Sequence, residues 1–296
     1  MSENTSSTTT VKPHFKLWAK KAEANEVTPQ HPHKPFPGWV YGVLFVIFDI
    51  IVVTALEVGV SSSSTRVQLS SPTVGFGFVS KMWTDGNFVF VLNVILVALL
   101  YLMLLMLLNR FWASSIVMLA AGIIVAVIEH FKIEIRYEAI LPADLGFLGS
   151  NTGNMLTFAP AGAHVTILIA LAVFAVLLVP VLALRYADGR KGRMIQTDDR
   201  RLNLTSRLIL LLLPILVFAL YCMHVSTTNS LANKFSRALG DTPSMWDSVY
   251  DAQRNGPLVA FTRQLNPKIM DKPSNYSEET MKKVAARYQK KAEMIN

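Results

Sequence analysis

The chain has 296 residues, of which 52% are hydrophobic and 16% are charged, and its formal net charge is +8. Soluble domains contain about 25% charged residues, so this composition excludes an ordinary soluble enzyme. A single cysteine, Cys222, excludes a disulfide scaffold within one chain. The apolar residues occur in long uncharged runs, which predicts an integral membrane protein.

Five runs approach or reach the about 20 mostly apolar residues that a helix needs to cross the hydrocarbon core. They are residues 38–60, 87–108, 111–128, 164–184 and 208–226. Only two residues separate the second run from the third, which predicts a tight antiparallel hairpin. Pro214 lies inside the fifth run and is expected to kink it. The predicted fold class is therefore all-α, a polytopic membrane protein with five transmembrane helices.

The basic residues predict the orientation of these spans. With the N-terminus inside, the inner segments 1–37, 109–110 and 185–207 contain 13 Lys and Arg residues, and the outer loops 61–86 and 129–163 contain 4. Short cytoplasmic loops carry an excess of Lys and Arg. We therefore expect a cytoplasmic N-terminus and an extracellular C-terminus. Because this topology explains the positive charge, we do not expect nucleic acid as a partner.

Three polar residues fall inside the predicted spans and are candidate membrane-embedded sites: Asp49, Glu57 and Asn93. Carboxylates in lipid are costly and are therefore often functional. A proton or ion pathway would need further polar partners, and the second, fourth and fifth spans offer only Asn93 and His164. The alternative is an interhelical hydrogen bond for Asp49 and a Glu57 that reaches water at the outer boundary.

The outer loop after the third span concentrates charge at the membrane surface. Its candidate lipid-headgroup residues are Lys132, Arg136, Glu138 and Asp144. Arg offers a fixed fork for phosphate oxygens and Lys a compact charge, while the carboxylates could accept hydroxyls. The alternative is an ion-pair network that anchors the loop. Pro142 is expected to start a short in-plane helix, and the spacing of acidic and His residues is poor for a metal site.

The segment after the fifth span predicts an outer helical linker over 227–296. Residues 227–243 are expected to be a connector, and a first helix is expected to begin at Ser244 as its N-cap. A second short helix is predicted after Pro257, and a third after Ser277, with Glu278 and Glu279 in its first turn. No Walker loop, GxSxG, HExxH or CxxC motif occurs in the chain.

Two runs of residues resemble the membrane half of the lipoteichoic acid synthase family, phosphoglycerol transferases of the sulfatase/alkaline-phosphatase superfamily. The first run is Lys132, Arg136, Glu138, Pro142, Asp144 and Leu145, and the second is Asn255, Gly256, Pro257, Leu258 and Phe261, followed by Pro273, Tyr276, Ser277, Glu278 and Glu279. The resemblance covers roughly residues 37–296. Five spans with the N-terminus inside are also similar to that family, although they are less specific.

The resemblance implies a function in the plasma membrane of a bacterium. Members of the family transfer glycerol phosphate from phosphatidylglycerol to a glycolipid-anchored polymer, with a threonine nucleophile and manganese in an external sulfatase-like domain. That domain would follow Asn296, so we expect no catalytic residue, cofactor or metal in this chain. The expected organisation is a basic tail (1–37), a five-span domain (38–226) and a linker (227–296) to a catalytic domain in cis or in trans. The alternative is a non-enzymatic transporter subunit or assembly partner.

Overall fold

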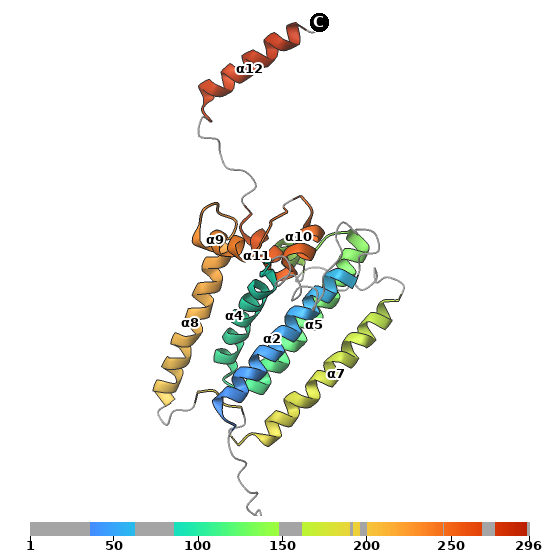
Figure 1. Ribbon diagram of the computed structural model, residues 1–296, viewed down its shortest axis with the longest axis vertical. Coiled ribbons are helices and arrows are strands. Elements are labelled where there is room, and N and C mark those ends of the chain that lie inside the picture. The colour runs from blue at the N-terminus through green and yellow to red at the C-terminus, as the bar shows by residue number, and fades with distance from the viewer. Residues whose placement is uncertain are drawn as a thin grey trace, which may run out of the picture.

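In a computed structural model, the described parts of the chain are helical and contain no strand (Figure 1). The structure describes residues 36–62, 86–147, 162–189, 192–195, 200–244, 246–267 and 276–294. Five of the helices are long and apolar enough to cross a membrane. This confirms the predicted fold class. The basic tail and most of the expected in-plane stretch after Leu145 lie outside the described residues.

The five spanning helices occur where the apolar runs predicted them. They are α2 (Gly38–Ser62), α4 (Val89–Leu108), α5 (Phe111–Arg136), α7 (Ala163–Ala187) and α8 (Arg200–His224). Two helices differ most from their predicted bounds: α5 continues eight residues beyond the predicted end at Ile128, and α8 begins eight residues before the predicted start at Leu208. In this last part of α5, His130 lies near Glu134, and Lys132 pairs with Glu138 and Asp144 of the following loop. The helix ends only at Tyr137, whose φ of 55° is left-handed.

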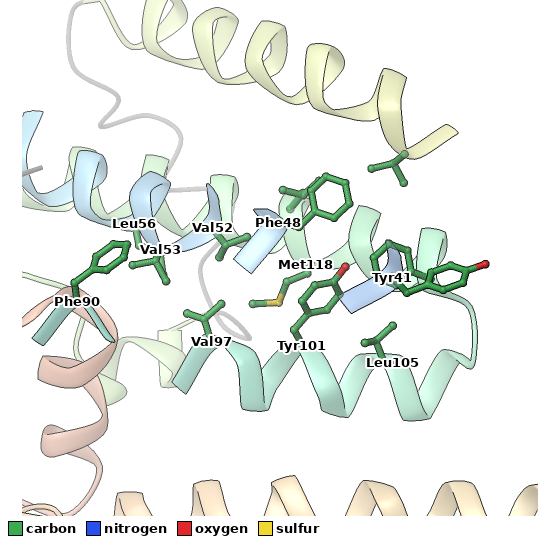
Figure 2. Close-up of a cluster of buried hydrophobic side chains, with 13 residues drawn as sticks. Tyr41, Phe48, Val52, Val53, Leu56, Phe90, Val97, Tyr101, Leu105 and Met118 are labelled. Atoms are coloured by element: carbon green, nitrogen blue, oxygen red, sulfur yellow. The ribbon is translucent and has the colours of Figure 1, made fainter. Parts of the chain in front are cut away.

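Three of these helices form the core of the bundle. Side chains of α2, α4 and α5 meet in one cluster, where Phe48, Val52, Tyr101 and Met118 gather between the ribbons (Figure 2). α7 packs on α5 and α8 packs on α4, at opposite sides of this core (Figure 1). Most apolar side chains of these two outer helices remain exposed, as expected for surfaces that face lipid.

Glycines allow α2 and α5 to approach closely. A Cβ added at Gly59 would lie 2.5 Å from the carbonyl oxygen of Ala126, and one added at Gly122 would lie 2.8 Å from Cγ1 of Val52. Membrane helices lack a hydrophobic force between them, so they depend on such close packing of small residues. This explains why α2 and α5 share the most extensive contact in the bundle.

Three short helices lie across one end of the bundle, and we call them the cap. They are α9 (Leu231–Ala238), α10 (Ser248–Asn255) and α11 (Pro257–Leu265), and Figure 1 shows them above α4, α2 and α8. The expected connector over 227–243 was wrong, because Ser230 caps α9 by accepting a hydrogen bond from the amide of Asn233. A last helix, α12 (Glu278–Glu293), stands apart from the bundle in Figure 1 and buries no residue.

The helix caps show where the sequence-based boundaries succeeded. Ser277 caps α12 by accepting from the amide of Thr280, as predicted. The predicted N-cap at Ser244 was wrong: α10 begins at Ser248, and Asp247 accepts hydrogen bonds from the amides of Val249 and Tyr250. Asp and Ser are both good N-caps, so residue type alone could not separate these two positions.

Replacing Gly59 with alanine should destabilise the bundle, because the new methyl group collides with the backbone of Ala126. Overpacking of this kind costs on the order of 1–3 kcal/mol. Gly42→Ala is the matched control in the same helix, since nothing lies within 4 Å of its added Cβ. Thermal unfolding in detergent should show a lower Tm for Gly59→Ala alone, and equal Tm values for the two variants would contradict the close packing of α2 on α5.

Candidate functional site

Lys132 lies in the last turns of α5, at its cap end, beside the loop that follows this helix. Its Nζ lies 2.6 Å from Oδ2 of Asp144 and 3.3 Å from Oε2 of Glu138. It also donates a 2.7 Å hydrogen bond to the carbonyl of Ala139. The Lys132 side chain is only 10% exposed. Three predicted site residues are therefore brought together, with both carboxylates directed at the same ammonium group.

The loop that follows α5 is shaped by the same contacts. Asp144 lies in a 3₁₀-helix, η1 (Pro142–Phe147), and its Oδ2 accepts a hydrogen bond of 2.6 Å from the amide of Leu141, just before that helix. Pro142 opens η1, as the sequence predicted. The amide of Ile140 donates to Oε2 of Glu129 at 3.0 Å. These bonds satisfy the loop backbone and hold it against the end of α5.

Arg136 differs from its charged neighbours. His130 and Glu134 lie 3.6 Å apart and Lys132 is paired, but no carboxylate of the described residues lies within ion-pair distance of the exposed Arg136. The residues on either side of it, Ile135 and Tyr137, are each 47% exposed. Apolar and aromatic side chains beside a cation are typical of the level where lipid headgroups begin.

The three membrane-embedded candidates are all buried, at 1% exposed for Asp49 and 2% for Glu57 and Asn93. Glu57 therefore does not reach water, contrary to the interfacial interpretation. Oδ1 of Asp49 has no hydrogen-bond partner among the described residues, so the expected interhelical hydrogen bond is not formed through that atom. Asn93 joins two separate elements by hydrogen bonds.

Asn93 connects α4 to the cap. Its Nδ2 donates to the carbonyl of Val89 at 3.0 Å and to the carbonyl of Asn255 at 2.9 Å. The next residue, Gly256, has a φ of 85°, and a Cβ there would lie 2.2 Å from the Asn93 amide nitrogen. Only glycine accepts both the left-handed backbone and this contact. Pro257 then opens α11, where its missing N–H costs nothing.

A buried ion cluster holds the cap together, and sequence reasoning missed it. Nη1 of Arg263 lies 2.5 Å from both carboxylate oxygens of Asp251, and Nη2 contacts Oδ1 of Asp241. All three residues are at most 2% exposed. Asp251 also accepts from the amide of Ser244 at 3.0 Å and from Nδ2 of Asn255 at 2.8 Å. One signal was present in the sequence, an arginine within the apolar run LVAFTRQL.

The charges of this cluster compensate one another. Burial by itself lowers the pKa of the Arg263 guanidinium, but Asp251 and Asp241 outweigh this effect and raise its pKa above the ordinary value. Ser236 donates a 2.6 Å hydrogen bond to the second oxygen of Asp241. A buried charge is tolerated only where its partners and hydrogen bonds are in place. We therefore interpret the cluster as a structural element and not as a ligand-binding site.

Comparison of the chain with protein-family models, curated proteins and solved structures found no match. Within the described residues, no group of three or more His, Cys, Asp and Glu side chains is placed to hold a metal ion. The family resemblance and the expectation of manganese in a following domain stay predictions.

Arg263→Leu should destabilise the protein strongly, because it leaves Asp241 and Asp251 buried without their cation. Breaking a buried pair in this way costs about 3–5 kcal/mol. Lys282→Ala is the contrasting control: its 2.8 Å pair with Glu278 is 76% exposed on the lysine side and should contribute about 0–1 kcal/mol. The measurement is Tm together with limited proteolysis of the cap, and an Arg263→Leu protein as stable as Lys282→Ala would contradict the cluster.

Proposed function

We propose that this chain is the membrane module of a phosphoglycerol transferase similar to lipoteichoic acid synthase. The module binds the headgroup of phosphatidylglycerol beside the cap and positions an extracellular sulfatase-like domain, in cis or in trans, for synthesis of a glycolipid-anchored envelope polymer. The observation that carries the proposal is Arg136, an exposed guanidinium at the end of a spanning helix with no carboxylate partner among the described residues.

The neighbours of Arg136 suit an anionic headgroup. Lys132 is occupied by Asp144 and Glu138, so it anchors the loop and leaves the planar fork of Arg136 as the group that can take two phosphate oxygens. Exposed Ile135 and Tyr137 supply apolar surface for the glycerol and the start of the acyl chains. The candidate site is thus reduced from four residues to Arg136, supported by a loop that the other three hold in place.

The cap supports the second part of the proposal. Asn93 bonds the carbonyl of Asn255 at the end of α10, and the Arg263 cluster joins α11 to α10, which supports a fixed position of the cap on the membrane domain. The chain then continues to α12, whose exposed surface carries basic residues. A domain that follows would be held over the same end of the bundle at which Arg136 lies.

Arg136→Ala should weaken binding of short-chain phosphatidylglycerol to the purified chain, measured by calorimetry in a neutral detergent. A lost charge-assisted bidentate contact costs about 1.5–3 kcal/mol, or roughly 10- to 150-fold in Kd. Arg136→Lys should recover part of the affinity because the charge remains and the fork does not. Arg237→Ala, at an exposed arginine of the cap, is the control and should leave Kd unchanged.

Lys132→Ala separates anchoring from binding. Because Lys132 holds Asp144 and Glu138, its loss should lower the Tm, whereas Arg136→Ala should not. If Arg136→Ala binds the lipid with the affinity of the unmodified chain, the headgroup site is elsewhere and the proposal loses the observation on which it rests.

The proposed orientation places the cap outside the cell. In a Cys222→Ser background, an impermeant thiol reagent applied to intact bacteria should label Trp246→Cys, because Trp246 is 83% exposed on the cap. Gly189→Cys, exposed after α7 at the opposite end of the bundle, should be labelled only after the cells are opened. The reverse pattern would place the cap in the cytoplasm and exclude the proposed function.

A further inference from the structure

The described residues contain an apolar groove between α4 and α8. Helix α8 is at the side of the bundle away from α7 (Figure 1). The volume of the groove is about 280 Å³, and only apolar side chains line it. They are Leu99, Leu102 and Met106 of α4, and Leu210, Leu213, Pro214 and Val217 of α8. Proline inside a helix removes a backbone hydrogen bond and disturbs the preceding turn, which gives a physical reason for imperfect packing at this position.

Arg207 lies at the end of this groove that is remote from the cap. Its Nε donates to the carbonyl of Met106 at 3.1 Å and its Nη2 to the carbonyl of Leu107 at 2.5 Å. Met106 itself lines the groove, so the guanidinium is directly beside it. The two bonds satisfy free carbonyls at the C-terminus of α4, and they also hold the guanidinium in a fixed position.

Among the described residues, no carboxylate neutralises the charge of Arg207. Its partners are carbonyls, and no carboxylate of the described chain forms an ion pair with it. Arg110 and Arg185, at the same end, are exposed, and no described carboxylate forms an ion pair with either; they lie 6.0 and 4.4 Å from the ring centroid of Trp112. The buried Asp188 is also at this end and accepts hydrogen bonds from Tyr41 and from the amide of Gly192. This end of the bundle is therefore positive over several neighbouring elements.

One turn before Arg207, the side chain of Asn203 adds a hydrogen-bond acceptor. Its Oδ1 is buried and has no hydrogen-bond partner in the described part of the chain. Residues four apart lie on the same face of a helix, so Asn203 and Arg207 belong to one face of α8. A cation beside an apolar groove is the complement of a phosphate joined to an acyl chain.

We propose that the α4–α8 groove with Arg207 at its end is a binding site for one anionic phospholipid of the leaflet opposite the cap. An acyl chain lies along Leu102, Leu213 and Val217, and the phosphate accepts hydrogen bonds from Arg207. This site is separate from the one proposed at Arg136, because the two arginines lie at opposite ends of the bundle. Basic pockets between helices near the membrane surface commonly select anionic headgroups.

A phospholipid accounts for both halves of the site. A second copy of the chain could cover the apolar groove, but the exposed carboxylates of Glu278 and Glu279 are on α12, beyond the cap, and already pair with Lys282 and Lys283. A soluble anion could pair with Arg207 but would gain nothing from the groove. The groove volume lies just below the about 300–1,000 Å³ of small-molecule pockets, as suits a thin chain rather than a folded segment.

The test measures lipid retained by the purified chain in native mass spectrometry, from an equal mixture of phosphatidylglycerol and phosphatidylcholine. All variants carry Arg136→Ala, which removes the other proposed headgroup contact. We expect this background to prefer phosphatidylglycerol about tenfold or more, the value of one charge-assisted contact. Arg207→Gln can still bond the α4 carbonyls, and it should abolish the preference while both lipids remain bound.

Groove filling provides the matched pair of variants. Leu213 lines the groove and Leu212 does not, and the two are 62% and 63% exposed. Leu213→Trp should lower retention of both lipids several-fold, whereas Leu212→Trp should retain them as the background does. Tm in lipid-free detergent shows that each variant is folded.

Three results would overturn the proposal. The first is an unchanged preference for phosphatidylglycerol in Arg207→Gln, and the second is equal lipid retention in the two tryptophan variants. The third is a change of oligomeric state in Leu213→Trp with no loss of lipid, which would assign the groove to a second copy. None of these results bears on binding at Arg136, so this inference and the proposed function fail independently.

Discussion

Three segments of the cap meet at the guanidinium of Arg263, where carboxylates approach it from the loop after α9 and from α10. Because Asp241 and Asp251 are buried, their alternative is an unpaired charge in a medium that solvates it poorly. Separating the segments would leave buried charges unpaired. This penalty, more than a strong net attraction, holds the three segments together. Asn255 donates a hydrogen bond to Asp251, and its backbone carbonyl accepts one from Asn93 of α4. The ion cluster is in this way connected to the spanning helices.

The basic residues at the two ends of the bundle have different partners. At the cap end, Lys132 forms ion pairs with Glu138 and Asp144, whereas Arg136 lies beside the exposed side chains of Ile135 and Tyr137. At the opposite end, Arg207 bonds backbone carbonyls and keeps its charge. In both places a guanidinium lies at the boundary of an apolar surface. An arginine beside apolar surface therefore occurs at both ends of the bundle, on α5 and on α8, and a separate lipid site is proposed at each end.

The bundle core places further limits on how such sites can move. Contact of α2 with α5 depends on positions where no Cβ fits, at Gly59 and Gly122, so these two helices cannot slide without steric conflict. α7 and α8 pack only from the outside and expose most of their apolar residues. Adjustments to lipid are therefore expected first at the α4–α8 contact, where the groove lies, and last at the α2–α5 contact.

The amino-acid sequence by itself determined the number and approximate position of the spanning helices, since hydrocarbon demands about 20 apolar residues from any crossing helix. It also located the short helix at Pro142, the start of α11 at Pro257 and the Ser277 cap of α12, because these depend on local backbone chemistry. α9 was missed although its residues are amphipathic, because a segment of eight residues is too short for its periodicity to be distinguished from a connector; in the structure it packs on α8.

Only the tertiary structure decided which polar residues are partners. Lys132 and Arg136 are equivalent in sequence, four residues apart on one helix, yet the fold of the loop brings Asp144 to the first and not to the second. Asp241, Asp251 and Arg263 are separated by 10 and 12 residues and become one cluster only when α10 and α11 fold back on each other. Ion pairing depends on distances of a few ångströms across elements, and helical periodicity carries no information about that separation.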